Sequence, residues 1–66
     1  MTVTVNGELR EIPEGLSVAE LLQELGIRTG RIAVELNREV LPRDLYGTRR
    51  LADGDVVEIV HFIGGG

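Results

Sequence analysis

The sequence predicts an α+β fold in which a mixed sheet of four to five strands carries one main helix on one face. Three observations lead to this prediction: a strand pair joined by Asn6-Gly7, one amphipathic helix after it, and a long β-branched strand over 56–63. A hydrophobic period of two residues is typical of a half-buried strand, and a period of 3.6 is typical of a helix. At 66 residues we expect one domain over 1–63 and a flexible glycine tail over 64–66.

The first strand pair is predicted from alternation and from a turn signal. Residues 2–5 alternate threonine with valine, and Asn6-Gly7 follows at once. This dipeptide favours a type I′ turn, because both central residues of that turn need positive φ. The returning strand is expected over 8–12 and ends at Pro13, since proline cannot donate to the ladder.

A short helix follows the hairpin. Ser17 and Glu20 have the spacing of a capping box, in which each side chain accepts a hydrogen bond from the backbone amide of the other residue. Gly26 stands where a left-handed residue ends a helix. The apolar stripe at helical spacing consists of Val18, Leu21, Leu22 and Leu25.

The second half of the chain predicts two short strands and one long one. Residues 32–36 alternate as a strand, and Asn37-Arg38 makes a tight connection into a short strand over 39–41. Residues 44–47 indicate a turn or a single helical turn, and 52–55 carry a further turn signal.

The last strand is expected to be central in the sheet. Residues 56–63 are rich in β-branched side chains, which is typical of a strand with neighbours on both sides. One of its faces would pack on the helix. The other face, with Val60 and Phe62, would then be left for a partner protein.

Composition excludes several classes of function. The net charge of −4 argues against nucleic acid as a ligand, and no apolar run approaches the roughly 18 residues of a membrane span. The N-terminus lacks a signal-peptide layout, so we expect a cytoplasmic protein. The chain has no Cys, no Lys and only one His, so we predict no metal site and no cofactor of its own.

The run Gly64-Gly65-Gly66 has two readings. Chain termini are commonly frayed, and three glycines without side chains fit that description. Alternatively, the run is a narrow tail that threads a channel in an enzyme. Four extended residues from Ile63 would reach roughly 13 Å beyond the sheet.

The carboxylate of Gly66 is the group we expect to carry chemistry. A carboxylate is a poor acyl donor, but adenylation by ATP makes it a mixed anhydride. A sulfur nucleophile can attack that anhydride and leave a thiocarboxylate. Because the chain has neither Cys nor Lys, the terminus is the best place for a covalent cargo, and the catalysis would belong to partner enzymes.

The chain resembles the ThiS family, the sulfur carriers of thiamin biosynthesis, which are small ubiquitin-like (β-grasp) proteins that end in a diglycine. The resemblance covers nearly the whole chain. It is carried by the combination of order, short length and glycine terminus, over 3–8, 21–26, 32–37, 40–43 and 51–59.

The resemblance implies a mechanism and a set of partners. Gly66 would be adenylated by an E1-like enzyme that uses ATP, take sulfur from a donor such as a cysteine desulfurase, and pass it to a thiazole synthase. Gly65 matches the other glycine of the terminal pair. The residues expected to contact partners are Val60, Phe62, Ile63, Gly64 and Gly65.

Two other functions fit the same residues. The first keeps the chemistry and changes the pathway, to tRNA thiolation or molybdopterin synthesis. The second is a non-covalent β-grasp interaction module. His61 is expected at the surface or in an interface, and Arg43, Arg49 and Arg50 are expected to be solvated, with Arg43 also able to meet a partner's carboxylate.

Overall fold

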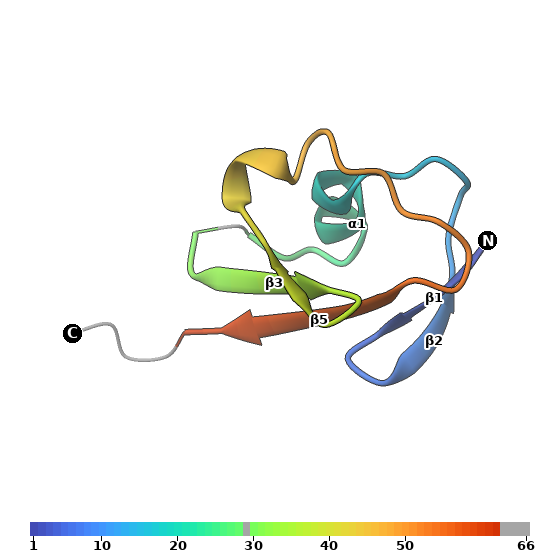
Figure 1. Ribbon diagram of the computed structural model, residues 1–66, viewed down its shortest axis with the longest axis horizontal. Coiled ribbons are helices and arrows are strands. Elements are labelled where there is room, and N and C mark those ends of the chain that lie inside the picture. Colours follow the sequence, from blue (N-terminus) through green and yellow to red (C-terminus); the bar gives the residue numbers. More distant parts are fainter. Residues whose placement is uncertain (29, 63–66) are drawn as a thin grey trace.

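The computed structural model describes residues 1–28 and 30–62. It contains a five-stranded mixed sheet in the order β2-β1-β5-β3-β4, with one α-helix and one 3-10 helix. Figure 1 shows that α1 and the long loops lie on one side of the sheet. The elements are β1 (Thr2–Val5), β2 (Glu8–Glu11), α1 (Val18–Glu24), β3 (Ile32–Leu36), β4 (Glu39–Leu41), η1 (Arg43–Leu45) and β5 (Val56–His61). The predicted α+β fold is confirmed.

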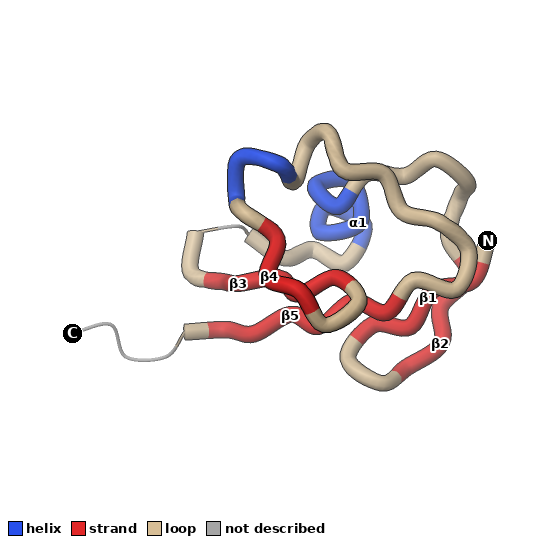
Figure 2. The backbone as a smooth tube through the Cα atoms, viewed as in Figure 1, coloured by secondary structure: helices blue, strands red, loops and turns tan. Residues whose placement is uncertain are grey.

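The two tight hairpins form as their sequences predict. In the β1–β2 turn, Asn6 has φ of 49° and Gly7 has φ of 84°, which are the positive values that a type I′ turn requires. In the β3–β4 turn, Asn37 and Arg38 also have positive φ, at 53° and 71°. Asparagine tolerates this region better than other side chains, and arginine does so at a cost in strain. Figure 2 shows both turns as loops between paired strands.

The helix is positioned by its capping box. The Glu20 amide donates to Ser17 Oγ over 3.1 Å, and the Ser17 amide donates to Glu20 Oε1 over 2.9 Å. These bonds satisfy amides at the helix start that have no partner within the helix. At the other end, Gly26 has φ of 71°, as predicted for the residue that stops the helix.

The core lies between α1 and the sheet. Valine and leucine side chains at alternate strand positions point towards the helix, and three residues of the helical stripe meet them. Leu25, the fourth residue of the stripe, is only half-buried. The side chains with at most 2% exposure are Val3, Val18, Leu21, Leu22, Ile32, Val34 and Val57.

The last strand is central, as predicted. β5 pairs in parallel with β1 through Thr4 and Val5, and antiparallel with β3 over the whole length of that strand. The strand ends at His61, two residues before the predicted end, and Ile63 lies outside the described residues. The predicted boundary between residues 63 and 64 lies outside them as well.

Candidate functional site

The candidate site is the end of β5 and the sheet face that α1 does not cover. We call this face the open face. It follows from the register: residues paired across strands point to the same side, and residues next to each other in a strand point to opposite sides. Val57 and Ile59 are buried under the helix, so Val56, Glu58 and Val60 point the other way. The part of the open face that β3, β4 and β5 form consists of Ala33, Glu35, Val40, Val56, Glu58 and Val60.

Two asparagine side chains, one from each hairpin turn, form hydrogen bonds with the backbone of β5. Asn6 accepts from the Ile59 amide over 2.7 Å and donates to the Ile59 carbonyl over 3.3 Å, so it extends the pairing between β1 and β5 by one step. Asn37 accepts from the Val56 amide over 2.9 Å. Each asparagine is thus both a turn residue and a backbone partner of the central strand.

Beyond Ile59, the described residues give β5 a neighbouring strand on one side only. The Asn6 side chain is the last partner from the β1 side, whereas β3 continues the pairing as far as His61. The Phe62 amide then donates to the Arg31 carbonyl over 2.9 Å. Figure 1 shows β5 running out past β1 at this end of the sheet. The strand is therefore fixed by β3 up to the point where the sequence continues into residues 63–66.

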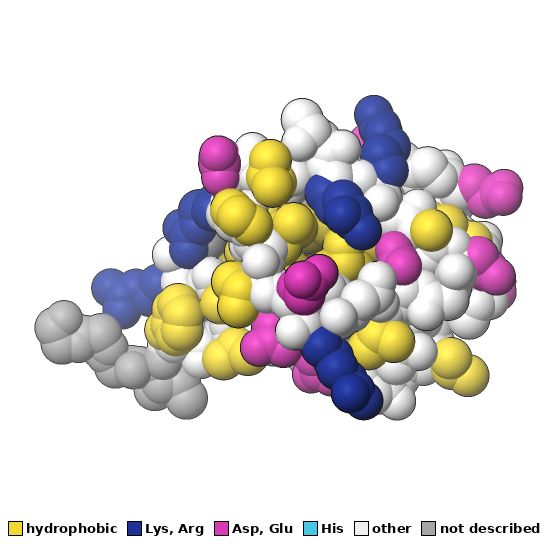
Figure 3. Space-filling model, viewed as in Figure 1, with side chains coloured by type: hydrophobic (Ala, Val, Ile, Leu, Met, Phe, Trp, Pro, Cys, Tyr) yellow, Lys and Arg dark blue, Asp and Glu magenta, His cyan; other side chains and the backbone are white. Residues whose placement is uncertain are grey.

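Exposed apolar side chains gather at this end of the molecule. Val60 is 48% exposed and Phe62 56%, which is unusual for large hydrophobic residues. Figure 3 shows hydrophobic side chains near the end of β5, with both basic and acidic side chains near them. Phe62 is thus not part of the core, and its place on a partner-facing surface stays a prediction.

Two carboxylates face each other at the centre of the open face. Glu35 of β3 and Glu58 of β5 are register partners. Residues paired in this way have Cβ atoms about 5 Å apart, and like charges at that separation repel. Neither residue forms an ion pair or a side-chain hydrogen bond with another described residue.

Sequence reasoning did not find this carboxylate pair. In the sequence the acidic residues are spread over several elements, which indicates no more than solubility or a guide for a basic partner. The alternation in each strand does predict that Glu35 points to the other face of the sheet from Val34, and Glu58 to the other face from Val57. What the sequence lacks is the register between β3 and β5, which sets the two carboxylates side by side.

The remaining sequence-predicted residues divide between this site and structural roles. His61 is exposed, as expected. Arg43 is exposed, as expected, and its guanidinium also donates to the carbonyls of Gly30 and Ile32 over 3.3 and 3.0 Å. Its contact with a partner's carboxylate stays a prediction. Arg50 donates to the Gly15 carbonyl over 2.7 Å and lies 3.6 Å from Glu20. The sequence predicts partner contacts for Ile63, Gly64 and Gly65 and chemistry at Gly66, and these four residues lie outside the described ones.

Glu20, which lies away from the site, has a shifted pKa. The Ser17 backbone and hydroxyl hydrogen bonds, with a smaller contribution from the Arg50 charge, hold the pKa of Glu20 below its ordinary value. This carboxylate serves the helix start. Over residues 1–28 and 30–62 there is no cluster of three His, Asp or Glu side chains that could hold a metal ion.

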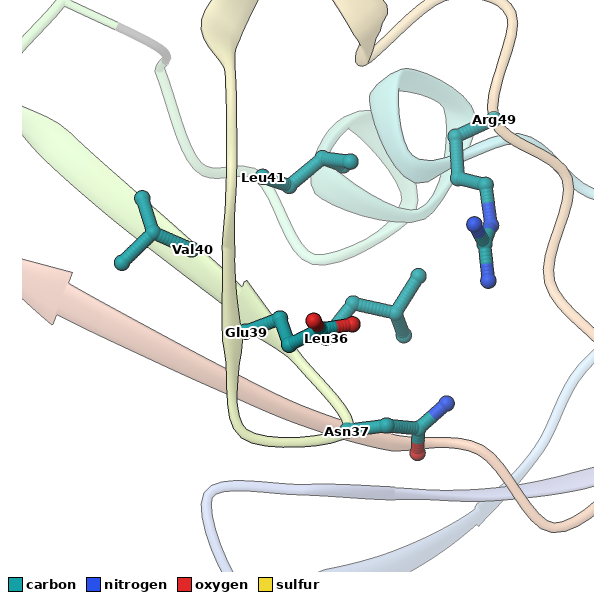
Figure 4. A pocket seen from close by; sticks show the side chains of 6 residues that line it. All are labelled: Leu36, Asn37, Glu39, Val40, Leu41 and Arg49. Carbon is teal, nitrogen blue, oxygen red and sulfur yellow. The ribbon is translucent and has the colours of Figure 1, made fainter.

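A pocket of about 200 Å³ lies at the opposite end of the sheet, beside the β3–β4 turn. Figure 4 shows the Glu39 carboxylate and the Arg49 guanidinium approaching it from different elements. Leu36 pairs with Val57 near the start of β5, so this pocket is remote from the end of that strand. Its lining residues are Leu36, Asn37, Glu39, Val40, Leu41 and Arg49.

None of the helices within the described ranges is long and apolar enough to cross a membrane.

Comparison with known proteins identifies the family. The family model of the ThiS family matches residues 3–66. The sulfur carrier protein ThiS of Thermus thermophilus is 42% identical over 97% of this chain and 98% of its own length. A thiazole synthase of Paramagnetospirillum magneticum is 44% identical over the whole chain. The chain spans about a fifth of the length of the thiazole synthases that it matches.

Structural comparison agrees with the sequence comparison. The crystal structure of the thiamine biosynthesis protein ThiS from Geobacter metallireducens superposes with a TM-score of 0.86 at 42% identity, and covers 100% of both chains. At this identity the likeness extends beyond the fold to the family, and the ubiquitin-like β-grasp architecture is confirmed. The chain therefore belongs to the ThiS family.

Proposed function

We propose that this protein is a sulfur carrier of thiamin biosynthesis whose Gly66 carboxylate is converted to a thiocarboxylate. The observation that carries the proposal is the family match over residues 3–66, which includes the glycine run. The fold supports it, because the last strand is fixed in the centre of the sheet and leads in sequence directly to that run.

The chemistry needs two steps, both catalysed by a partner. An E1-like adenylating enzyme transfers AMP from ATP to the carboxylate and releases pyrophosphate. Hydrosulfide then attacks the acyl carbon and AMP leaves, which gives the thiocarboxylate. A protein persulfide would first give an acyl disulfide, and a second thiol must cleave its S–S bond to release the thiocarboxylate and leave a disulfide. The carrier is a co-substrate in this scheme: ATP is bound by the enzyme, and the chain contributes a terminus and a docking surface.

The proposed recipient of the sulfur is a thiazole synthase. One supporting observation is that relatives named thiazole synthase contain a region matching this whole chain. Carrier and synthase are thus parts of one polypeptide in those proteins. For the present chain, we propose a cysteine desulfurase as the physiological sulfur source. We also propose that the reactions take place in the cytoplasm.

The test is an intact mass measurement. The protein is first purified from its own cell to establish that Gly66 is its final residue. It is then incubated with ATP, sodium sulfide and the adenylating enzyme of that cell. We expect a mass gain equal to the exchange of one oxygen for sulfur, and no gain in a chain that lacks Gly66. An unmodified full-length chain, with an enzyme active on another carrier, would refute the proposal.

A further inference from the structure

The open face combines apolar surface with an uncompensated charge. Val40 and Val60 are 70% and 48% exposed, and Val40 pairs directly with Glu35. Glu35 in turn pairs with Glu58, and Val60 follows two positions along the same face of β5. The two carboxylates therefore lie among apolar side chains and not at a hydrated rim.

This arrangement is unfavourable for the free protein. Like charges directly opposite each other in a sheet destabilise it. Within residues 1–28 and 30–62 no arginine forms an ion pair with Glu35 or Glu58, because the ion pairs of this part of the chain join Arg10 to Glu8 and Arg50 to Glu20. A cation supplied from outside would relieve the repulsion and would be held more strongly once the surrounding valines exclude water.

A second copy of this chain does not fit the open face. Two such faces brought together would place four carboxylates in one apolar contact, and the chain carries a net charge of −4. Desolvating unpaired charges is costly, so the acidic pair opposes self-association. The complementary surface must present an arginine or a lysine within an apolar patch.

We propose that the open face docks on the thiazole synthase, and that one arginine or lysine of the synthase inserts between Glu35 and Glu58. The inference rests on the proposed carrier function. The synthase is favoured as the occupant because this domain forms part of the same polypeptide as the synthase in its relatives. Arginine fits best, since its planar guanidinium can bond two carboxylates at once.

The geometry also relates docking to delivery. Val60 and Phe62 lie at the end of β5 from which the sequence continues to the glycine run. A synthase held on the open face is therefore held beside the point where the run begins. Glu58 of the acidic pair lies two residues before Val60 on β5. A contact of the synthase with the pair would therefore set the position of β5 on the synthase.

The experiment measures binding of the unmodified chain to the thiazole synthase from the same cell, by isothermal titration calorimetry at two salt concentrations. Glu35→Gln/Glu58→Gln removes the charge pair and keeps the shape of both side chains. Glu14→Gln/Glu24→Gln is the matched control, because it removes the same charge from exposed residues that lie off the sheet. Thermal unfolding of all three proteins checks that each is folded.

We expect the open-face variant to bind the synthase at least about tenfold more weakly, while the control binds within about twofold of the natural chain. The affinity of the natural chain should fall as salt rises, and that of the open-face variant should fall less. The open-face variant should also melt no lower than the natural chain, which shows that the loss is not one of folding.

Three results would overturn the inference: equal loss in both variants, undiminished binding by the open-face variant, or no binding by the natural chain. The outcome is separate from that of the mass measurement, because binding is measured without sulfur. A chain that takes up sulfur and binds regardless of the pair would leave the carrier function intact.

Discussion

Both faces of the sheet carry valines, but the valines of the two faces differ in burial and in role. Val34 and Val57 point towards α1 and are fully buried, whereas Val40 and Val60 occupy the alternate positions and are 70% and 48% exposed. Burial of the first pair contributes to folding, and each fully buried valine is worth roughly 1.5–3 kcal/mol. The second pair contributes little until a partner covers it. The burial places the stability of the fold on the helix side, and our proposal places recognition on the open face.

The largest difference in stability is expected when one leucine is truncated on each side of the sheet. Leu21 is fully buried in the helix and Leu9 is 77% exposed on β2. We expect Leu21→Ala to lower the free energy of unfolding by about 2–5 kcal/mol, because it leaves a cavity. Leu9→Ala should change it by less than about 0.5 kcal/mol. Urea denaturation measures both, and equal losses would mean that the two sides do not differ in this way.

A smaller effect is expected at the helix start. Ser17→Ala removes the hydroxyl that accepts from the Glu20 amide, and should lower the free energy of unfolding by about 1 kcal/mol. Glu20→Gln is the control, since glutamine can still accept from the Ser17 amide. If the alanine variant melted at the temperature of the natural protein, the capping box would not support the helix.

An effect of opposite sign is expected on the open face. Glu58→Gln removes one of two facing like charges, so the free energy of unfolding should rise by roughly 0.2–0.5 kcal/mol. The gain should shrink at high salt, because salt screens exposed charges. Chemical denaturation at two salt concentrations checks this. A destabilised variant would show that Glu58 contributes to the fold and is not held there at a cost.

The smallest effect concerns pH. The folded pKa of Glu20 lies below its ordinary value of 4.5, owing first to the Ser17 backbone hydrogen bond. The carboxylate therefore stabilises the fold above the unfolded pKa, and this contribution is lost as the pH falls through the lower folded pKa. Glu20→Gln should make stability less dependent on pH in that window. If the free energy of unfolding fell with acidic pH in Glu20→Gln as it does in the natural protein, this pH dependence would not come from Glu20.

The sequence predicts the fold because its signals are local. Asn6-Gly7 sets a hairpin by its own backbone preference, and Ser17 with Glu20 sets a helix start within four residues. The central place of β5 follows from its composition. The glycine run points to the terminal chemistry by its position alone, so this part of the site is a prediction from sequence and family.

The rest of the site depends on contacts between distant segments. The Glu35–Glu58 pair exists because of the β3–β5 register, and no pattern within either strand reveals that register. Arg43 looks like a turn charge in the sequence, yet its guanidinium reaches back to Ile32. Asn6 looks like a turn residue only, although its side chain also pairs with the backbone of β5.

The most direct test of the division between the two faces uses one valine from each. Val34→Ala and Val60→Ala are compared by unfolding midpoint and by affinity for the thiazole synthase, at a temperature where both variants are folded. We expect Val34→Ala to lower the midpoint and to bind as the natural chain does. Val60→Ala should keep the midpoint and bind more weakly. If Val60→Ala binds the synthase as tightly as the natural chain, the open face is not the recognition surface.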